Sequence, residues 1–96
     1  GKPVKPTALI TGGSRGIGYG IASHLARAGF DLAINGMRPE SAVTEALDGL
    51  RSLGAEVLYC PGDVASAEAR AAMLSTIQRH FGRLNVLVNN AGVAPK

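Results

Sequence analysis

The chain has 96 residues, of which 46% are hydrophobic, 18% charged and 4% aromatic, a composition that fits one small globular domain. Its net charge of +3 is scattered along the chain, and no aromatic residues interleave with the basic ones, so we expect no nucleic-acid partner. A single cysteine excludes an internal disulfide and argues against a metal site, and no stretch has the roughly 20 apolar residues of a membrane span or the pattern of a signal peptide, so we expect a cytoplasmic protein.

Four short and nearly continuous apolar runs are typical of strands that are buried on both faces. These runs are residues 8–11 (ALIT), 31–35 (DLAIN), 56–60 (EVLYC) and 85–89 (NVLVN).

Between the runs, apolar residues recur at helical spacing and predict three helices. The expected buried stripes are Ile17, Ile21, Leu25 and Ala28; Val43, Leu47, Leu50 and Leu53; and Ala69, Met73, Ile77 and Phe81. Gly29, Gly54 and Gly82 follow these stripes and predict the helix C-termini. Pro39 lies near the expected start of the second helix, and Ser66 is the expected N-cap of the third.

The resulting order β-α-β-α-β-α-β predicts an α/β fold, a doubly wound parallel sheet with helices on both faces and right-handed crossovers. We assign residues 1–96 to a portion of a single domain. The strand order would be 3-2-1-4, which is the first half of such a sheet, so we expect the domain to continue beyond residue 96. The fourth strand would then be an apolar edge that soluble proteins avoid.

The segment TGGSRGIGYG, residues 11–20, holds five glycines between the first predicted strand and the first predicted helix. A helix N-terminus presents free N–H groups and a partial positive charge, and glycines let a pyrophosphate approach the backbone closely. Tight turns also use glycine for steric reasons alone, so the strand-turn-helix context is what favours a dinucleotide site. A Walker P-loop is excluded, since no Lys-Ser or Lys-Thr pair follows Gly16 or Gly18.

The glycine spacing is Thr11-Gly12-x-x-x-Gly16-x-Gly18, and two further stretches follow later strands: GDV at 62–64 and NNAG at 89–92. These three motifs, in this order, resemble the cofactor-binding half of the short-chain dehydrogenase/reductase family. Among its members the chain looks most similar to reductases of the 3-oxoacyl-acyl-carrier-protein type. The resemblance implies that residues 1–96 are the dinucleotide-binding, Rossmann-type portion of a single domain.

The resemblance implies a role for each matching residue. The pyrophosphate and the adenosine ribose would be held by Gly12, Ser14, Arg15, Gly16, Ile17 and Gly18. Asp63 would accept a hydrogen bond from the adenine amino group, and the Val64 backbone would contact the ring edge. Without the resemblance, the alternative for Asp63 is a helix-entry or turn residue. The ribose side of the pocket would be lined by Asn90, Ala91 and Gly92, with Asn89 bracing the sheet.

The end of the second strand bears on the choice between NAD and NADP. Selectors for NAD place a carboxylate there, whereas this chain has Asn35, Gly36, Met37 and Arg38. Arg15 and Arg38 could both pair with a 2′-phosphate. We therefore expect NADP as the cofactor, with NAD the less favoured choice; the alternative for Arg38 is a solvated loop residue.

The family's chemistry implies a Ser and a Tyr-x-x-x-Lys pair, and neither tyrosine of this chain fits. Tyr19 is followed at i+4 by Ser23 and Tyr59 by Asp63, so we expect both tyrosines to be packing residues. His24, His80 and Cys60 are likewise expected to be surface or packing residues. We therefore expect no catalytic residue in these 96 positions.

Two functions remain open. One is an NADP(H)-dependent oxidoreductase that transfers hydride between nicotinamide and a carbonyl or alcohol substrate, and the family resemblance implies a homo-oligomer, a tetramer or a dimer. The other is a non-catalytic dinucleotide-binding module or NADP(H) sensor. The sequence beyond residue 96 would discriminate between them.

Overall fold

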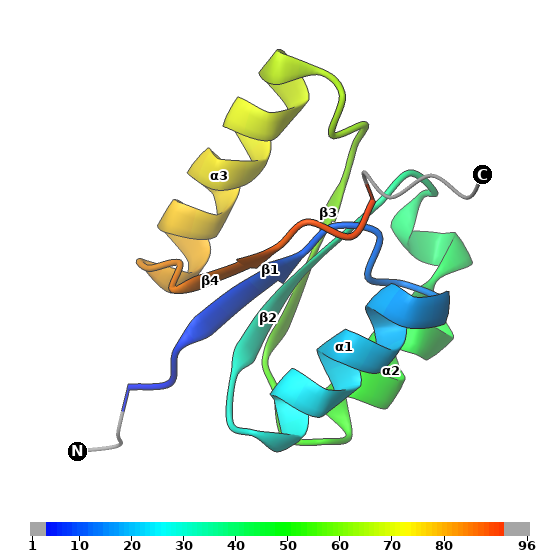
Figure 1. Cartoon of the computed structure of the whole chain (residues 1–96), viewed down its shortest axis with the longest axis vertical. Coiled ribbons are helices and arrows are strands. Elements are labelled where there is room, and N and C mark those ends of the chain that lie inside the picture. Colours follow the sequence, from blue (N-terminus) through cyan, green and yellow to red (C-terminus); the bar gives the residue numbers. More distant parts are fainter. Residues whose placement is uncertain (1–3, 92–96) are drawn as a thin grey trace.

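One parallel sheet, with strands in the order β3-β2-β1-β4, organises the computed structural model, which describes residues 4–91 (Figure 1). The elements in chain order are β1 (Thr7–Ile10), α1 (Gly16–Arg27), β2 (Asp31–Gly36), the 3-10 turn η1 (Glu40–Ala42), α2 (Thr44–Arg51), β3 (Val57–Pro61), α3 (Ala67–Phe81) and β4 (Val86–Val88). The predicted α/β class and strand order are confirmed, and no strand bound is shifted by more than one residue.

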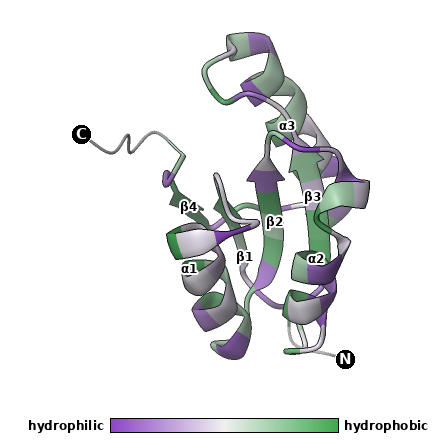
Figure 2. Cartoon of the chain, turned by 90° about the vertical axis from the view of Figure 1, so that its right-hand side faces the viewer, coloured by the Kyte–Doolittle hydropathy of each residue, from purple (hydrophilic) through white to green (hydrophobic). Residues whose placement is uncertain are grey.

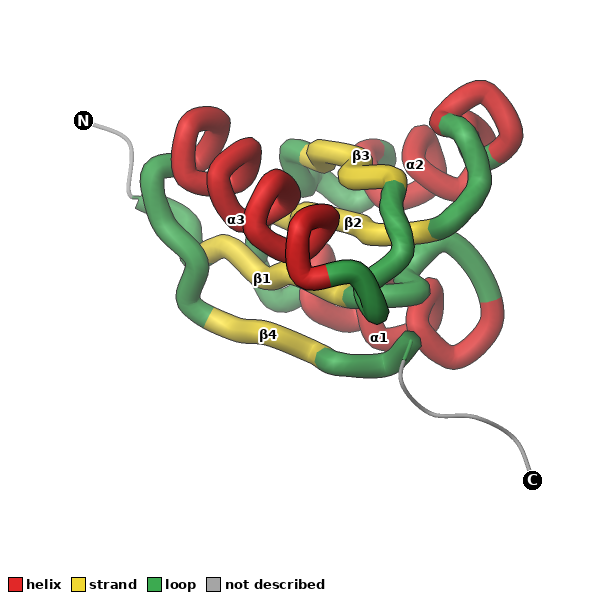
Figure 3. Tube along the Cα trace, turned by 90° about the horizontal axis from the view of Figure 1, so that it is seen from above, coloured by secondary structure: helices red, strands yellow, loops and turns green. Residues whose placement is uncertain are grey.

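Helices cover both faces of the sheet: α1 and α2 pack on one face and α3 on the other (Figures 1 and 3). Because side chains alternate along a strand, Ala8 and Ile10 of β1 join the core under α1 and α2, while Leu9 joins the core under α3. The strands β1, β2 and β3 are therefore apolar along most of their length, as the hydropathy colouring shows (Figure 2). This two-sided burial explains why the strands read as continuous apolar runs rather than alternating ones.

The buried face of α1 differs from the predicted stripe. Gly18, Ala22 and Ala26 are the buried residues of this helix, whereas Ile17 is 77% exposed. Ile21, Leu25 and Ala28 lie on the flanks: the first two are partly buried and Ala28 is exposed. The helix starts directly from the glycine turn, and at Gly18 it lies too close to the Gly12 carbonyl for any side chain. The spacing of large apolar residues could not reveal this.

The second helix begins later than predicted. Pro39 precedes the short 3-10 turn η1, and α2 starts only at Thr44. Between the two, Val43 has a φ of −125°, which interrupts the helix, while its side chain is buried in the core. The expected stripe is buried at Val43, Leu47 and Leu50 and partly buried at Leu53.

The predicted helix termini are confirmed. Gly29, Gly54 and Gly82 follow α1, α2 and α3 in left-handed conformations. The Ser66 hydroxyl accepts a hydrogen bond from the Ala69 N–H at 3.1 Å and caps α3.

Strand β4 forms one edge of the sheet, and its central residue Leu87 is 60% exposed. Within residues 4–91, no helix covers this edge (Figure 3). None of the helices in the same range is long and apolar enough to cross a membrane.

Two glycines of α1 provide a matched test of its close packing. A Cβ at Gly18 would lie 2.2 Å from the Gly12 carbonyl oxygen, whereas a Cβ at Gly20 would meet nothing within 4 Å. We expect Gly18→Ala to lower the free energy of unfolding by about 1–3 kcal/mol, because backbone must move. Gly20→Ala should raise it by up to about 1 kcal/mol, because alanine is the better helix former. Urea unfolding measures both, and equal effects of the two substitutions would show that α1 does not pack closely on the turn.

Candidate dinucleotide-binding site

The three motifs identified in the sequence meet at the carboxyl end of the sheet. In a parallel sheet all strands finish at the same end, so the segments after β1, β2, β3 and β4 become neighbours (Figure 1). The strand order reverses between β1 and β4, and ligands of open α/β sheets bind in the crevice at such a reversal.

The turn after β1 is held from both sides. On one side the Thr11 N–H donates to the Val88 carbonyl of β4 at 3.1 Å, and on the other the Gly13 N–H donates to the Asn35 carbonyl of β2 at 3.0 Å. Gly12 and Gly16 have φ angles of 62° and 60°, which favour glycine over any other residue. The turn is therefore a fixed backbone arc rather than a loose loop.

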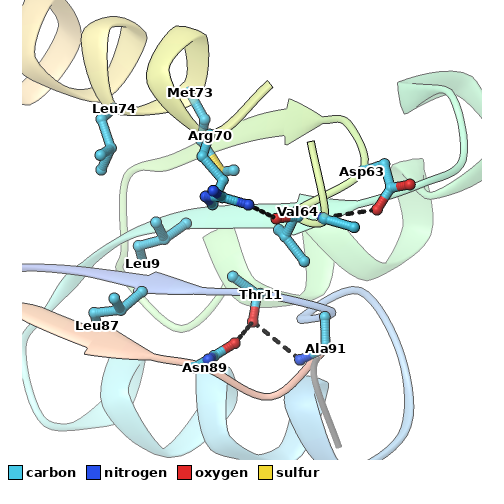
Figure 4. A pocket seen from close by; sticks show the side chains of 11 residues that line it. Leu9, Thr11, Asp63, Val64, Arg70, Met73, Leu74, Leu87, Asn89 and Ala91 are labelled. Carbon is cyan, nitrogen blue, oxygen red and sulfur yellow. Dashed lines mark hydrogen bonds between the residues drawn. The ribbon is translucent and has the colours of Figure 1, made fainter. Parts of the chain in front are cut away.

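The Thr11 hydroxyl joins this arc to the segment after β4. It accepts hydrogen bonds from the Asn90 N–H at 2.9 Å and the Ala91 N–H at 3.0 Å, and it lies 3.3 Å from the Val88 carbonyl, to which it can donate. The predicted bracing role of Asn89 rests on a contact of 3.4 Å with the same hydroxyl (Figure 4). Sequence reasoning did not single out Thr11 as a site residue, although it begins the glycine motif.

Asn90 uses its side chain for the arc as well. Its Nδ2 donates to the Gly12 carbonyl at 3.3 Å, so Asn90 holds the turn in addition to its predicted place beside the ribose. Ala91 follows Asn90 beside the glycine turn. Gly92, the last residue predicted to line the ribose side, lies outside the described residues.

Asn35 is the second residue whose part in the site the sequence analysis missed. Its side chain is buried at the end of β2, where Nδ2 donates to the carbonyls of Cys60 and Gly62, each at 3.0 Å. Its Oδ1 accepts from the Gly12 N–H at 3.4 Å. Asn35 thus ties the ends of β2 and β3 to the glycine turn. The available signal was a polar residue inside an otherwise apolar buried strand, since such a residue needs internal partners.

The N-terminus of α1 is open toward this edge. Arg15 occupies the N-cap position in an extended conformation without a side-chain capping bond, and the first turn of the helix contains no acidic residue. The first N–H groups of a helix have no partners inside the helix and carry partial positive charge. Gly16, Ile17 and Gly18 form this first turn, as predicted, and the arrangement suits an anion.

A hollow of about 230 Å³ lies between the glycine turn and the ends of β2 and β3. It brings together most of the residues predicted to bind a cofactor. Its lining comprises Gly12, Ser14, Arg15, Asn35, Gly36, Met37, Arg38, Gly62, Asp63, Val64 and Ala91. Arg15 comes from the segment after β1, Arg38 from the segment after β2 and Asp63 from the segment after β3. Cationic and anionic groups therefore line different parts of the hollow.

Asp63 is exposed and takes part in the turn that leads into α3. Its Oδ1 accepts from the Ala65 N–H at 2.9 Å. This bond confirms the turn interpretation that we kept open for Asp63. A carboxylate accepts several hydrogen bonds, so the turn bond leaves room for a further donor. The carbonyl of the neighbouring Val64 accepts from Arg70 Nη1, which fixes the backbone there (Figure 4).

A larger hollow of about 540 Å³ adjoins the first one on the α3 face of the sheet (Figure 4). Leu9, Met73, Leu74 and Leu87 supply its apolar part. The two hollows share Asp63, Val64 and Ala91, so the site continues from the strand ends over this apolar surface.

Tyr59, Cys60 and His80, which the sequence analysis expected to be packing or surface residues, all lie in such positions. Tyr59 is buried, and its hydroxyl donates to the Arg38 carbonyl at 2.7 Å. Cys60 is buried, and this burial raises the pKa of its thiol to about 11. His80 Nε2 lies 2.6 Å from Glu56 Oε2, and both side chains are exposed. The sequence did not reveal this partner, because the two residues are 24 positions apart. Among residues 4–91, no group of three or more His, Cys, Asp or Glu side chains could hold a metal ion.

Comparison with known proteins agrees with this geometry. The family model for short chain dehydrogenases matches residues 6–96. Hydroxynaphthalene reductase arp2 of Aspergillus fumigatus is 36% identical over 86 residues, covering 90% of this chain and 32% of that protein.

Two solved structures are similar in fold and sequence. A 3-oxoacyl-acyl-carrier-protein reductase from Brucella melitensis in complex with NAD has a TM-score of 0.87 and 41% identity, covering 97% of this chain and 36% of that one. L-Sorbose reductase from Gluconobacter frateurii, complexed with NADPH and L-sorbose, has a TM-score of 0.85 and 35% identity, covering 95% and 35%.

The chain therefore belongs to the short-chain dehydrogenase/reductase family, and its Rossmann-type fold matches that of the solved relatives over the part that it covers. The resemblance to reductases of the 3-oxoacyl-acyl-carrier-protein type is confirmed as well. The chain spans about a third of the length of the relatives described above.

The role of Asn35 can be tested against Asn85, an asparagine at the amino end of β4, on the far side of the sheet from the glycine turn. Asn85 Oδ1 accepts one bond, from the Thr7 N–H at 2.9 Å. We expect Asn35→Leu to lower the free energy of unfolding by about 1–3 kcal/mol, because it leaves two carbonyls and one N–H without their partner. Native-state hydrogen exchange should accelerate at Gly12 and Gly13.

Asn85→Leu serves as the matched control. It should accelerate exchange at Thr7 but leave the exchange of the Gly12 and Gly13 amides unchanged. If Asn35→Leu leaves the exchange of both glycine amides unchanged, then Asn35 does not hold the glycine turn.

Proposed function

We propose that this chain supplies the cofactor-binding half of an NADP(H)-dependent oxidoreductase, which transfers hydride between nicotinamide and a carbonyl or alcohol substrate. The observation that carries the proposal is the placement of Arg15 and Arg38 around one hollow at the open N-terminus of α1, with glycine at the end of β2. The nicotinamide cofactor supplies or accepts the hydride, and this chain binds and orients its adenosine and pyrophosphate part.

The pyrophosphate would lie along the glycine turn. Gly12 and Gly16 expose the backbone there, and the N–H groups at the start of α1 point toward this region. Because the turn is hydrogen-bonded to β2 and β4, little of its conformational entropy remains to be lost when the anion binds.

The adenine would lie near Asp63 and Val64, at the part of the hollow formed by the β3 segment. An adenine amino group donates hydrogen bonds, and the carboxylate of Asp63 accepts them. Ala91 would face the ribose from the β4 side, where Asn90 and Gly92 are also proposed to lie.

The preference for NADP rests on the charges around the adenosine ribose. Arg15 and Arg38 contribute two guanidinium groups to the hollow, and the last residue of β2 is Gly36 instead of a carboxylate. A 2′-phosphate can pair with guanidinium groups, whereas the ribose of NAD offers only a hydroxyl. The solved relatives include complexes with NAD and with NADPH, so the two arginines of this chain carry the argument.

The catalytic Ser and Tyr-x-x-x-Lys of the family have no counterpart in these 96 residues. Tyr59 cannot serve as the general acid of the hydride transfer, since its hydroxyl is bonded to the Arg38 carbonyl in the core. For the whole protein we propose hydride transfer on a carbonyl or alcohol substrate, a cytoplasmic location, and a homotetramer or homodimer.

Two substitutions test the cofactor preference. Arg15→Ala and Arg38→Ala should each weaken NADPH binding about 10- to 100-fold, because each removes a charge-assisted bond of roughly 1.5–3 kcal/mol. The affinity for NADH should change little. Isothermal titration calorimetry of the purified full-length protein with both nucleotides gives the two dissociation constants.

Arg79→Ala on the outer face of α3 is the control, since among residues 4–91 the Arg79 side chain bonds only to Ser75 and Thr76 of its own helix. It should leave both dissociation constants unchanged. Equal losses of NADPH and NADH affinity in the Arg15 and Arg38 variants would contradict the proposed preference for NADP.

A further inference from the structure

Position 36, at the end of β2, requires glycine because a side chain has no space there, and not because of the backbone conformation. Its φ lies outside the left-handed region, so an L-residue could adopt the same backbone. However, a Cβ at this position would lie 2.6 Å from Tyr59 Oη and 3.2 Å from Ser14 Oγ. A side chain at position 36 is therefore incompatible with the phenol of Tyr59 where it now lies.

The Tyr59 ring cannot move aside without cost. It projects from β3 into the core under α1 and α2, and only 6% of the residue is exposed. Its hydroxyl donates to the Arg38 carbonyl at 2.7 Å, which links β3 to the segment that follows β2. Displacing the ring would break this bond and disturb the packing of the core.

The charge state of Tyr59 fits a donor role. Burial raises the pKa of the phenol above its ordinary value of 10.0; among the neighbouring groups, Arg38 lowers it and Glu40 and Cys60 raise it. The hydroxyl therefore stays protonated at neutral pH and can donate to the Arg38 carbonyl.

We propose that Tyr59 is a positioning residue that sets the cofactor preference of this site. It acts in two ways. Its phenol fills the space that a carboxylate at the end of β2 would need in order to bind a ribose 2′-hydroxyl. Its hydroxyl also holds the Arg38 backbone, so that the guanidinium stays beside the hollow where a 2′-phosphate would bind. This inference rests on the proposed function, and it assigns the preference to a buried residue that does not line the hollow.

The first test is Tyr59→Phe in the full-length protein, with dissociation constants of NADPH and NADH measured by titration calorimetry. The substitution keeps the ring and removes only the hydroxyl. We expect NADPH affinity to fall about two- to tenfold, because the backbone of Arg38 loses its anchor, and NADH affinity to stay within about twofold. Tyr19→Phe, which removes the hydroxyl of the other tyrosine packed on the same core, should change neither constant.

A double-mutant cycle separates positioning from general destabilisation. If Tyr59 acts through Arg38, Tyr59→Phe should have no further effect on NADPH affinity in the Arg38→Ala background. Gly36→Ala provides an independent variant, since its methyl group must displace the phenol. It should reduce NADPH affinity by a similar factor, and Tyr59→Phe should add nothing to that reduction.

The outcomes distinguish this inference from the function on which it rests. A wild-type protein that binds NADH at least as tightly as NADPH, or binds neither, would overturn the proposed cofactor and this inference together. A wild-type protein that prefers NADPH, combined with an unchanged preference in both Tyr59→Phe and Gly36→Ala, would overturn this inference alone. Additive effects of Tyr59→Phe and Arg38→Ala would also contradict it, because the two residues would then act independently.

Discussion

The structure depends on the close contact between the first turn of α1 and the backbone that leaves β1. The Gly18 position lies so near the Gly12 carbonyl that no Cβ fits between them. This contact places the helix N-terminus directly above the sheet edge, and it makes the inner face of α1 a row of small residues. The chain thereby gains an anion-binding end of a helix at the point where the strand order reverses. The other features of the site are arranged around this contact.

Hydrogen bonds from neighbouring strands keep that contact in place. Thr11 connects the turn to the segment after β4, and Asn35 connects it to the ends of β2 and β3. Both side chains are buried and use their polar atoms on backbone groups of other segments. The site is thus largely formed before any ligand binds, and the residues that shape it are not those expected to touch the ligand.

The sequence was sufficient for the architecture because the local signals agreed with one another. Continuous apolar runs predicted two-sided strands, and Ser66 and Gly82 marked the ends of α3 correctly. The glycine spacing, with the motifs after β3 and β4, predicted where the site lies. The failures came from contacts between segments that are distant in the chain. The close contact of α1 involves Gly12 of the preceding turn, and the partners of Asn35, Tyr59 and His80 come from other elements. Periodicity within one segment carries no information about such contacts.

We propose that the hollow between Arg15 and Arg38 holds the 2′-phosphate of NADP, while the glycine turn holds the pyrophosphate. A crystal structure of the full-length protein with NADPH measures both placements at once. We expect the pyrophosphate to lie against the backbone between Gly12 and Gly18, and the 2′-phosphate to lie within hydrogen-bonding distance of both guanidinium groups. A 2′-phosphate that points into solvent, or a pyrophosphate bound away from the N-terminus of α1, would contradict it.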